Sequence, residues 1–418
     1  MLQLIMAFSI WASAASATCS TSALATHGVE IAPVFSSGRV QGQAADDRVE
    51  EAARQAFEVT WSKVLGDGNA WYRLQSVSCS DYEETCIAAL ARHEFGDTAV
   101  TNIVLWRLSD SGKLVCTAEF DASSIDPTVK PEDGAPANVE TELLPDGNAL
   151  LVLSVSAGNP WRVVVDASGK VLEKRKLVAG KEQGDFRRMC PLPGGRTALL
   201  GRIDRVPAVI ALDGSGHATW TQKYAPGDRD VVLVDAVGST NGELWVAEVR
   251  SVAEGGQWSL GDARLRRFDA KGLVMEVRPL PKPVMQFEAD PLGERLASMH
   301  PTEAGLAIEI RSWNDPTGPV LKRVDLPIAW DLGVNSNAVW HTRGLVVAGT
   351  IDGMPALATA SASFDSVRTY TERTHGPASV YFARPRRDGA YLLTATIYAP
   401  TPEGHRSRVL CEALKERP

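Results

Sequence analysis

The chain has 418 residues, of which 44% are hydrophobic and 22% are charged, and its 35 glycines and 24 prolines are scattered along its length. This composition is typical of a globular protein and excludes a disordered or low-complexity chain. The formal net charge is −8, with acidic and basic residues mixed throughout. Because no basic stripe is present, nucleic acid is not an expected partner.

The first residues, MLQLIMAFSIWASAASA, have the features of a secretory signal peptide. An apolar run from Leu2 to Ala12 is followed by Ala15-Ser16-Ala17, which fits the small-residue rule for signal peptidase. The run is shorter than the ~20 residues of a membrane span, and no later segment approaches that length. We predict a signal peptide over residues 1–17, no transmembrane segment, and a periplasmic or secreted protein. A lipid anchor at Cys19 is the weaker alternative, because Ser16-Ala17-Thr18 is a poor lipobox.

Residues 18–70 are predicted to hold one strand and one helix. The stretch HGVEIAPVF, residues 27–35, has strand composition. The stretch DDRVEEAARQAFEVTWSKVL, residues 46–65, places Val49, Ala53, Thr60 and Val64 on one face at helical spacing, with acidic residues in its first turn. We therefore predict a short N-terminal helix that caps the fold.

The six cysteines are expected to form disulfides if the protein is exported. Cys79 and Cys86 bracket the polar turn SDYEET between two apolar runs, so we predict that they bridge a hairpin. A ring of this size would stabilise the fold by about 2.5 kcal/mol. The pairing among the other four stays open: Cys19, Cys116, Cys190 and Cys411.

Hairpins of two kinds alternate from about residue 71 onward. In the first kind, a β-rich run reaches a polar turn, passes a glycine and resumes, as in VIALDGSGHATWTQKY. These turns are at Gly112, Gly169, Gly216 and Gly272. Hairpins of the second kind turn at Gly147, Gly195, Gly242, Gly305, Gly344 and Gly389. Two successive hairpins make a four-stranded antiparallel unit of ~45 residues, which is the size of one propeller blade.

The repeat predicts an all-β fold: a seven-bladed β-propeller of four-stranded antiparallel blades over residues 71–418. The expected blade starts are near Tyr72, Asn138, Asp185, Asp230, Glu294, Val334 and Ala378. The last blade lacks one strand when the chain ends at Pro418. We predict that the strand at residues 27–35 completes it and closes the ring, which leaves no open edge.

The run from Asp213 through Gly216 to Trp220 resembles the D-x-x-G-x-x-x-W repeat of secreted bacterial β-propellers in the WD40/quinoprotein-like group. The resemblance implies the propeller fold over about residues 70–415. It does not imply one activity, because this architecture hosts hydrolases, dehydrogenases, assembly factors and binding scaffolds. Quinone-dependent dehydrogenases of the group carry adjacent cysteines, and no two cysteines adjoin here. No cofactor is expected.

Generic catalytic and metal motifs are missing from the sequence. His93-Glu94 is half of a metalloprotease motif without its second histidine, and we interpret it as a surface pair. His300, His341 and His375 are placed near the inner strands of blades five to seven, where three imidazoles could bind a metal if they converged. We expect them to point in different directions, so no metal ligand or catalytic residue is assigned.

The connections between second and third strands, and those between blades, should lie on one face, opposite the tight glycine turns. Large aromatic and charged side chains in such loops are typical anchors for a partner. The predicted binding residues are Trp161, Arg205, Asp228, Arg229, Trp258, Trp313, Trp330 and His375.

We interpret the chain as a monomeric, exported, non-catalytic binding module for a protein or an envelope component. Two alternatives stay open. A propeller hydrolase or lactonase would carry a buried Asp/Glu/His cluster at the channel mouth. An inhibitor or immunity-type protein that blocks a secreted enzyme would carry a continuous patch of loop aromatics and charges.

Overall fold

The computed structural model describes residues 56–417, apart from gaps at 68, 80–83, 96–97, 130–135, 145, 156–159, 179–183, 195, 255–256, 282–283, 285, 291, 304, 330–337 and 402–403. The predicted signal peptide at residues 1–17, Cys19 and the strand expected at residues 27–35 lie outside this range. No helix within the described part of the chain has the length and apolar character that a bilayer crossing requires.

Within the described residues, the strands form seven antiparallel four-stranded sheets. Six sheets run in simple sequence order, so each is built from two consecutive hairpins, as the alternating glycine turns predicted. Blade one is β2 (Trp71–Cys79), β3 (Thr85–Phe95), β4 (Thr98–Leu108) and β5 (Leu114–Phe120). Blade two is β6 (Pro136–Leu143), β7 (Ala149–Val155), β8 (Pro160–Val165) and β9 (Val171–Lys176). Blade three is β10 (Gly184–Leu192), β11 (Arg196–Ile203), β12 (Val206–Leu212) and β13 (Ala218–Lys223).

The remaining blades follow the same plan. Blade four is β14 (Val231–Gly238), β15 (Leu244–Glu254), β16 (Gln257–Phe268) and β17 (Val274–Leu280). Blade five is β18 (Gln286–Ala289), β19 (Arg295–Thr302), β20 (Gly305–Ser312) and β21 (Lys322–Leu326). Blade six is β22 (Ala338–His341), β23 (Gly344–Ile351), β24 (Met354–Ser361) and β25 (Val367–Thr371). Blade seven is β26 (Ala378–Pro385), β27 (Ala390–Thr401), β28 (Gly404–Glu416) and β1 (Phe57–Leu65). Two short helical turns, α2 (Ala122–Ile125) and η1 (Pro226–Asp228), lie between blades.

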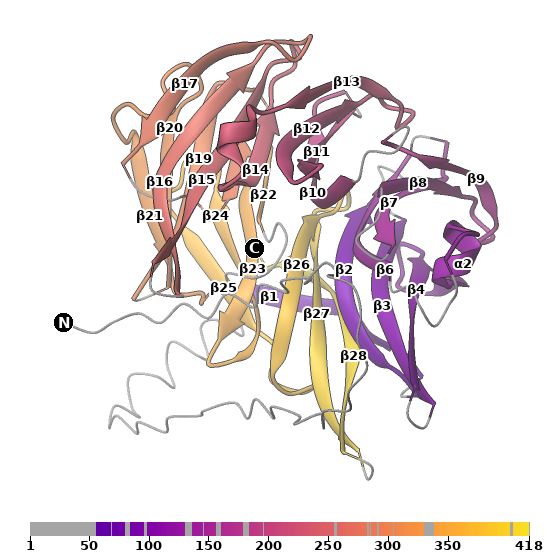
Figure 1. The fold of residues 1–418 in the computed structure, drawn as a ribbon. Helices are drawn as coiled ribbons and strands as arrows, with labels where there is room; N and C mark the ends of the chain where they lie inside the picture. Colours follow the sequence, from indigo (N-terminus) through magenta and orange to yellow (C-terminus); the bar gives the residue numbers. More distant parts are fainter. Residues whose placement is uncertain are drawn as a thin grey trace.

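The blades pack face to face around one axis. The first strand of each blade contacts the first strands of both neighbours, and Figure 1 shows these strands near the centre with β9, β13 and β17 at the outside. Among the described residues, buried apolar side chains form seven clusters, one between each pair of adjacent blades. The cluster that contains Leu74 and Phe382 joins blade one to blade seven. The ring is therefore closed, and the predicted seven-bladed propeller is confirmed.

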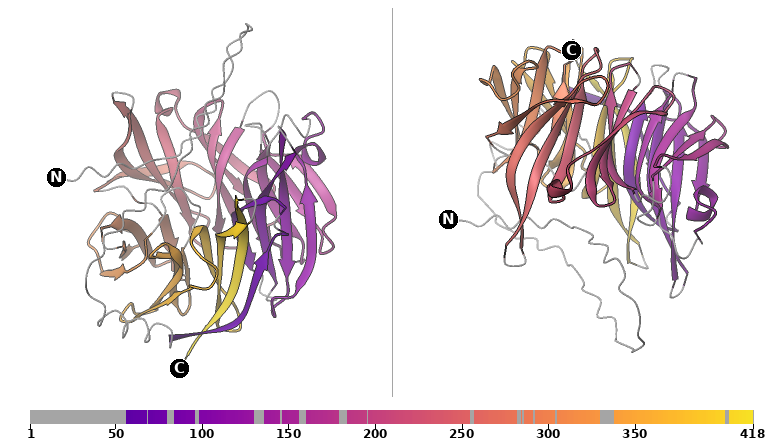
Figure 2. Two further views of the ribbon diagram at one scale, coloured as in Figure 1. Left: turned by 90° about the horizontal axis from the view of Figure 1, so that it is seen from below. Right: turned by 45° about the horizontal axis from the view of Figure 1, so that its top comes forward.

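The ring is closed by a strand where the sequence predicted a helix. Residues Phe57–Leu65 pair antiparallel with β28, from Phe57 opposite Glu416 to Leu65 opposite Val409, and Figure 2 shows this indigo strand beside the yellow β28. The helix expected at residues 46–65 is thus wrong over Phe57–Leu65, and its earlier part lies outside the described residues. An N-terminal strand does complete the last blade and covers the edge of β28. This strand is β1, and not the predicted strand at residues 27–35.

Six of the seven predicted blade starts agree with the observed first strands to within four residues. Blade five differs, because Glu294 lies between β18 and β19 and the four-residue strand β18 escaped recognition. The hairpin at Gly305 consequently joins β19 to β20, the second and third strands of blade five.

The predicted disulfide between Cys79 and Cys86 is not formed, and both residues are free thiols. In the β2–β3 pairing, Cys79 lies opposite Thr85 and Cys86 opposite Ser78. Neighbouring positions on a strand point to opposite faces of the sheet. Cys79 therefore packs toward blade seven, whereas the Cys86 sulfur lies 3.5 Å from the Thr141 hydroxyl of blade two.

Candidate functional site

The strand order divides the connections between the two faces of the wheel. Within each blade, the turns from first to second and from third to fourth strand lie on one face, which we call the turn face. The connections from second to third strand, and from each blade to the next, lie on the opposite face, which we call the loop face. This division agrees with the expectation from the sequence, and most of the predicted binding residues belong to the loop face.

The described tryptophans among the predicted residues are not surface anchors. Trp161 lies near the loop face but is only 9% exposed, packs between blades one and two, and is covered by the Lys176 ammonium 5.1 Å from its ring. Trp313 follows β20 on the turn face, is 4% exposed and packs between blades four and five. Both predicted binding roles are therefore corrected to core packing. Trp258 belongs to β16, but its side chain is not described, and Trp330 lies outside the described residues.

Charged side chains gather on the loop face of blades three and four. We call Asp204, Arg205, Asp228, Arg229, Asp230 and Arg250 the charged rim. The Arg250 guanidinium lies 3.8 Å from Asp228 Oδ1 and 3.3 Å from Asp230 Oδ2. Arg205 and Arg229 are exposed. The structure thus places three predicted residues, Arg205, Asp228 and Arg229, on the same part of the loop face.

The buried carboxylate of Glu248 supports the charged rim through hydrogen bonds. Glu248 in β15 is 1% exposed and accepts hydrogen bonds from the Tyr224 hydroxyl at 2.7 Å and from Arg264 Nε at 2.6 Å. The same carboxylate pairs with Arg266, which stacks over the Tyr224 ring at 4.3 Å. Arg264 also reaches Asp228 Oδ1 at 3.4 Å. Because Glu248 is buried and hydrogen-bonded on several sides, it holds Arg264, and through it Asp228, in a fixed place.

Glu248 was not predicted as a site residue, because a single glutamate in an apolar strand carries no motif. The alternation in LWVAEVRS does place its side chain on the same face as Val246 and Arg250. The alternation alone does not identify Glu248 as a paired acid. That identification also requires the register that brings Arg264 and Arg266 of β16 beside it. The register Glu248 opposite Arg264 comes from the hairpin itself.

A second ionic network lies on the first strands of five blades, which are near the centre of the wheel. Its members are Glu140, Arg188, Asp235, Glu288 and Arg384. Arg188 Nε lies 3.1 Å from Asp235 Oδ1, and Asp235 Oδ2 accepts the backbone N–H of Phe287 at 2.7 Å. Burial raises the pKa of Glu140 and of Glu288 to about 8. These carboxylates interact with arginines and backbone donors of other blades, and they link the first strands of those blades.

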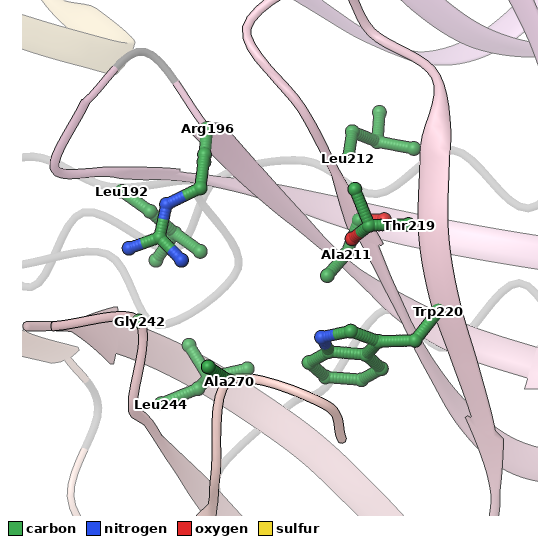
Figure 3. Close-up of a pocket in the computed structure, with 9 residues that line it drawn as sticks. All are labelled: Leu192, Arg196, Ala211, Leu212, Thr219, Trp220, Gly242, Leu244 and Ala270. Atoms are coloured by element: carbon green, nitrogen blue, oxygen red, sulfur yellow. The ribbon is translucent and has the colours of Figure 1, made fainter.

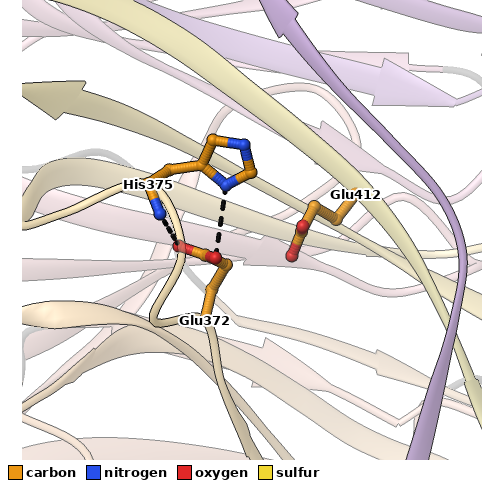
Figure 4. A group of neighbouring side chains, drawn as sticks. All are labelled: Glu372, His375 and Glu412. Atoms are coloured by element: carbon orange, nitrogen blue, oxygen red, sulfur yellow. Dashed lines mark hydrogen bonds and ion pairs between the residues drawn. The ribbon is translucent and has the colours of Figure 1, made fainter. Parts of the chain in front are cut away.

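A third polar cluster lies between blades six and seven, near the loop face (Figure 4). Glu372 and His375 come from the connection between these blades, and Glu412 comes from the middle of β28. Ligand atoms of the three side chains lie within 4.8 Å of one another. His375 Nδ1 is 3.2 Å from Glu372 Oε1, and Tyr370 donates its hydroxyl to Glu412 Oε2 at 3.0 Å. His375, a predicted binding residue, is thus part of a mixed imidazole and carboxylate site.

The three histidines considered for a channel metal do not converge. His300 packs within blade five, with its Nε2 3.2 Å from the Ser298 hydroxyl. His341 lies at the turn-face end of β22 against the Tyr391 ring, and burial lowers its pKa to about 4. His375 lies at the opposite face. His93 pairs with Glu119 at 3.0 Å on blade one.

A small cavity of about 130 Å³ opens on the turn face between blades three and four (Figure 3). Trp220, Leu192 and Leu244 supply apolar walls, and Arg196 lies along one side. Arg196 is held by the carbonyl oxygens of Pro193 at 3.1 Å and Ser239 at 3.0 Å. Its guanidinium therefore links the turn that contains Pro193 to the turn that begins at Ser239.

No family model matches the chain, and no curated protein matches it. Solved structures do. The Dos1 propeller has 12% identity and a TM-score of 0.48, over 85% of this chain and 95% of that chain. The WD40 domain of coronin from Toxoplasma gondii has 9% identity and a TM-score of 0.47, over 87% of each chain. KlAtg21, in a complex with the coiled coil of AgAtg16, has 11% identity and a TM-score of 0.49, over 79% of this chain and 95% of that chain. None of these likenesses bears on what this chain binds.

Proposed function

We propose that the protein is an exported, non-catalytic binding module that recognises a protein partner through the charged rim. One observation carries the proposal: Asp228 of the rim is tied through Arg264 to the buried carboxylate of Glu248. Arg250 lies between Asp228 and Asp230, and Asp228 is also reached by Arg264. Charges that are ordered before binding lose little side-chain entropy when a partner docks, which favours specific association.

The mixture of signs in the rim suits a protein surface better than a polyanion. Acidic and basic groups alternate over a short distance, so a partner must present a complementary pattern of both signs. Such a pattern raises the association rate and rejects surfaces of a single sign. The net charge of −8 for the whole chain agrees with this preference.

Export is proposed from the apolar run and the Ala15-Ser16-Ala17 sequence at residues 1–17. It predicts that the mature protein, recovered from the periplasm or the medium of the source cells, begins after Ala17. Mass spectrometry of the intact protein tests this. A cell-associated chain that retains residues 1–17 would contradict export without affecting the binding role.

Site-specific photocrosslinking in the source cells tests the binding role. A photoreactive phenylalanine analogue at Arg229, which is exposed on the rim, should form a covalent adduct with one protein. The same analogue at Leu273, which is 62% exposed on the turn face, is the matched control and should not form that adduct.

Charge reversal then tests whether the rim selects the partner. The double variant Asp228→Lys and Arg250→Glu should reduce the Arg229 adduct at least ~10-fold, because both signs of the rim are inverted. Equal adducts from Arg229 and Leu273, or an Arg229 adduct that survives the reversal, would reject the proposed surface.

A further inference from the structure

We propose that Glu372, His375 and Glu412 form a binding site for one divalent transition-metal ion of the zinc class, which ties the connection before blade seven to strand β28. The proposal does not depend on the binding function of the charged rim, because the two sites lie on different blades.

The geometry suits a single ion. In a tetrahedral zinc site, ligand atoms ~2.1 Å from the metal are ~3.4 Å from one another. Here the three ligand atoms lie within 4.8 Å, and the His375 Nδ1 to Glu372 Oε1 distance is 3.2 Å. Figure 4 shows the imidazole and both carboxylates directed toward a common point. Small rotations of the side chains would bring all three donors to one metal.

The charges of the cluster also indicate a cation. Glu372 is 2% exposed and Glu412 is 3% exposed, and a protonated His375 supplies at most one positive charge for the two carboxylates. Buried carboxylates are expected to be paired with cations or to coordinate metals. A divalent ion would neutralise the charges of both carboxylates.

The His375 ring provides a second, independent indication. Its Nδ1 is shielded from solvent and finds no partner of hydrogen-bond geometry within the described part of the chain, although Glu372 Oε1 is 3.2 Å away. A buried nitrogen that faces two carboxylates without a well-formed hydrogen bond is suited to donate its lone pair to a metal.

Neutral donors orient both carboxylates. The backbone N–H groups of Thr374 and His375 donate to Glu372. Tyr370, on strand β25 of the neighbouring blade six, donates to Glu412. Such outer hydrogen bonds are typical of metal sites, where they hold the ligands in place. They satisfy lone pairs without cancelling the negative charge, which leaves the cation to be supplied from outside.

The donor set selects the class of metal. One imidazole nitrogen and two carboxylate oxygens suit zinc and neighbouring transition metals, whereas calcium and magnesium prefer oxygen ligands alone. The His375 side chain is 28% exposed, so the site is open to solvent on one side. Water from that side would supply the fourth ligand.

Calorimetric titration of the full chain with zinc chloride, after removal of metals with EDTA, tests the proposal. We expect one equivalent of zinc to bind, and the midpoint of thermal unfolding to rise with zinc concentration because only the folded chain holds the three ligands together. Cobalt should bind with the visible absorption of a tetrahedral centre. Calcium should bind at least 10-fold more weakly than zinc.

Two ligand variants and one control make the test specific. Glu412→Gln and His375→Ala should each weaken zinc binding at least 10-fold. The second variant changes a partly exposed loop residue, so it remains informative if the first does not fold. His217→Ala is the control, because His217 is an exposed histidine 3.8 Å from one carboxylate, that of Asp213, and should leave binding unchanged. No zinc binding by the wild-type chain, or binding that both ligand variants retain, would overturn the proposal.

Discussion

The indole of Trp220 on the last strand of blade three packs against Gly272 in the outer turn of blade four. A Cβ atom added to Gly272 would lie 2.7 Å from two carbons of the Trp220 ring. The same relation joins blade seven to blade one, where a Cβ at Gly112 would lie 2.5 Å from the Trp61 ring. In both pairs, the glycine of one blade admits the indole of the preceding blade.

Gly272→Ala should therefore destabilise the fold by about 2–5 kcal/mol. The left-handed backbone at Gly272, with φ +83°, costs an alanine ~1–2 kcal/mol, and the overlap with Trp220 adds ~1–3 kcal/mol. Chemical denaturation measures the effect. Gly147→Ala is the matched control, because Gly147 has φ +81° but no atom of the described residues within 4 Å of an added Cβ. Equal losses for both variants would show that the indole contact contributes nothing.

Trp61→Ala should weaken the closure of the ring. The indole Nε1 donates to the Asp110 carbonyl oxygen of blade one at 2.9 Å, so truncation removes a hydrogen bond and the packing against Gly112. We expect a loss of about 2–4 kcal/mol in the free energy of unfolding. Trp61→Phe, which keeps most of the ring contact, should lose less than half as much. Hydrogen exchange should locate the loosening in β1 and β28, and a uniform increase over all blades would argue against a closure role.

Glu288→Gln should change how stability depends on pH. Burial raises the pKa of Glu288 to about 8, the negative charge of Asp235 raises it further, and Gln286 and Arg384 oppose the shift. Because the folded chain holds this proton more tightly than the unfolded chain, its stabilisation is present below about pH 4.5 and is lost as the pH rises through about 8. The variant stays neutral and escapes that loss.

Denaturation curves from pH 5 to pH 9 measure this effect. The stability of the wild type should fall relative to that of Glu288→Gln by roughly 2–4 kcal/mol over the range. Burial also raises the pKa of Glu140, so the stability of the variant should still depend on pH to some extent. Parallel curves for the two proteins would contradict the assignment.

The thiols of Cys79 and Cys86 should be free in the purified protein. Burial raises the pKa of both, that of Cys86 to about 12, so they should resist alkylation in the folded state and react once the chain is denatured. Peptide mapping after alkylation without a reductant measures this. A cross-linked peptide containing both residues would show that the β2–β3 register differs from the one described.

The hairpin pattern of the chain was largely predictable because it depends on local chemistry. Asp213 and Gly216 satisfy the requirements of their turn among themselves, with the Asp213 carboxylate accepting the N–H groups of Ser215 and His217. Each such turn can be recognised without knowledge of distant residues. The four-residue strand β18 was missed because its turn at Gly293 was not among the predicted glycine turns.

The strand β1 shows where local pattern fails. FEVTWSKVL follows an apparently helical run, yet it contains β-branched and aromatic residues that suit a strand equally well. This segment forms a strand because it pairs with the edge of β28, which is more than 340 residues away in the sequence. The cluster of Glu372, His375 and Glu412 depends on the same kind of distant pairing, so spacing along the chain could not reveal it.

By itself, the sequence determined the number of blades, the antiparallel hairpins within them and the division of connections between two faces, because turn residues and strand alternation act over a few positions. Only the tertiary structure decided which face of a sheet each side chain meets. That choice separates Cys79 from Cys86, buries Trp161 and Trp313, and brings Glu412 to His375. The physical reason is that register and blade packing are set by burial and hydrogen bonding summed over the whole ring.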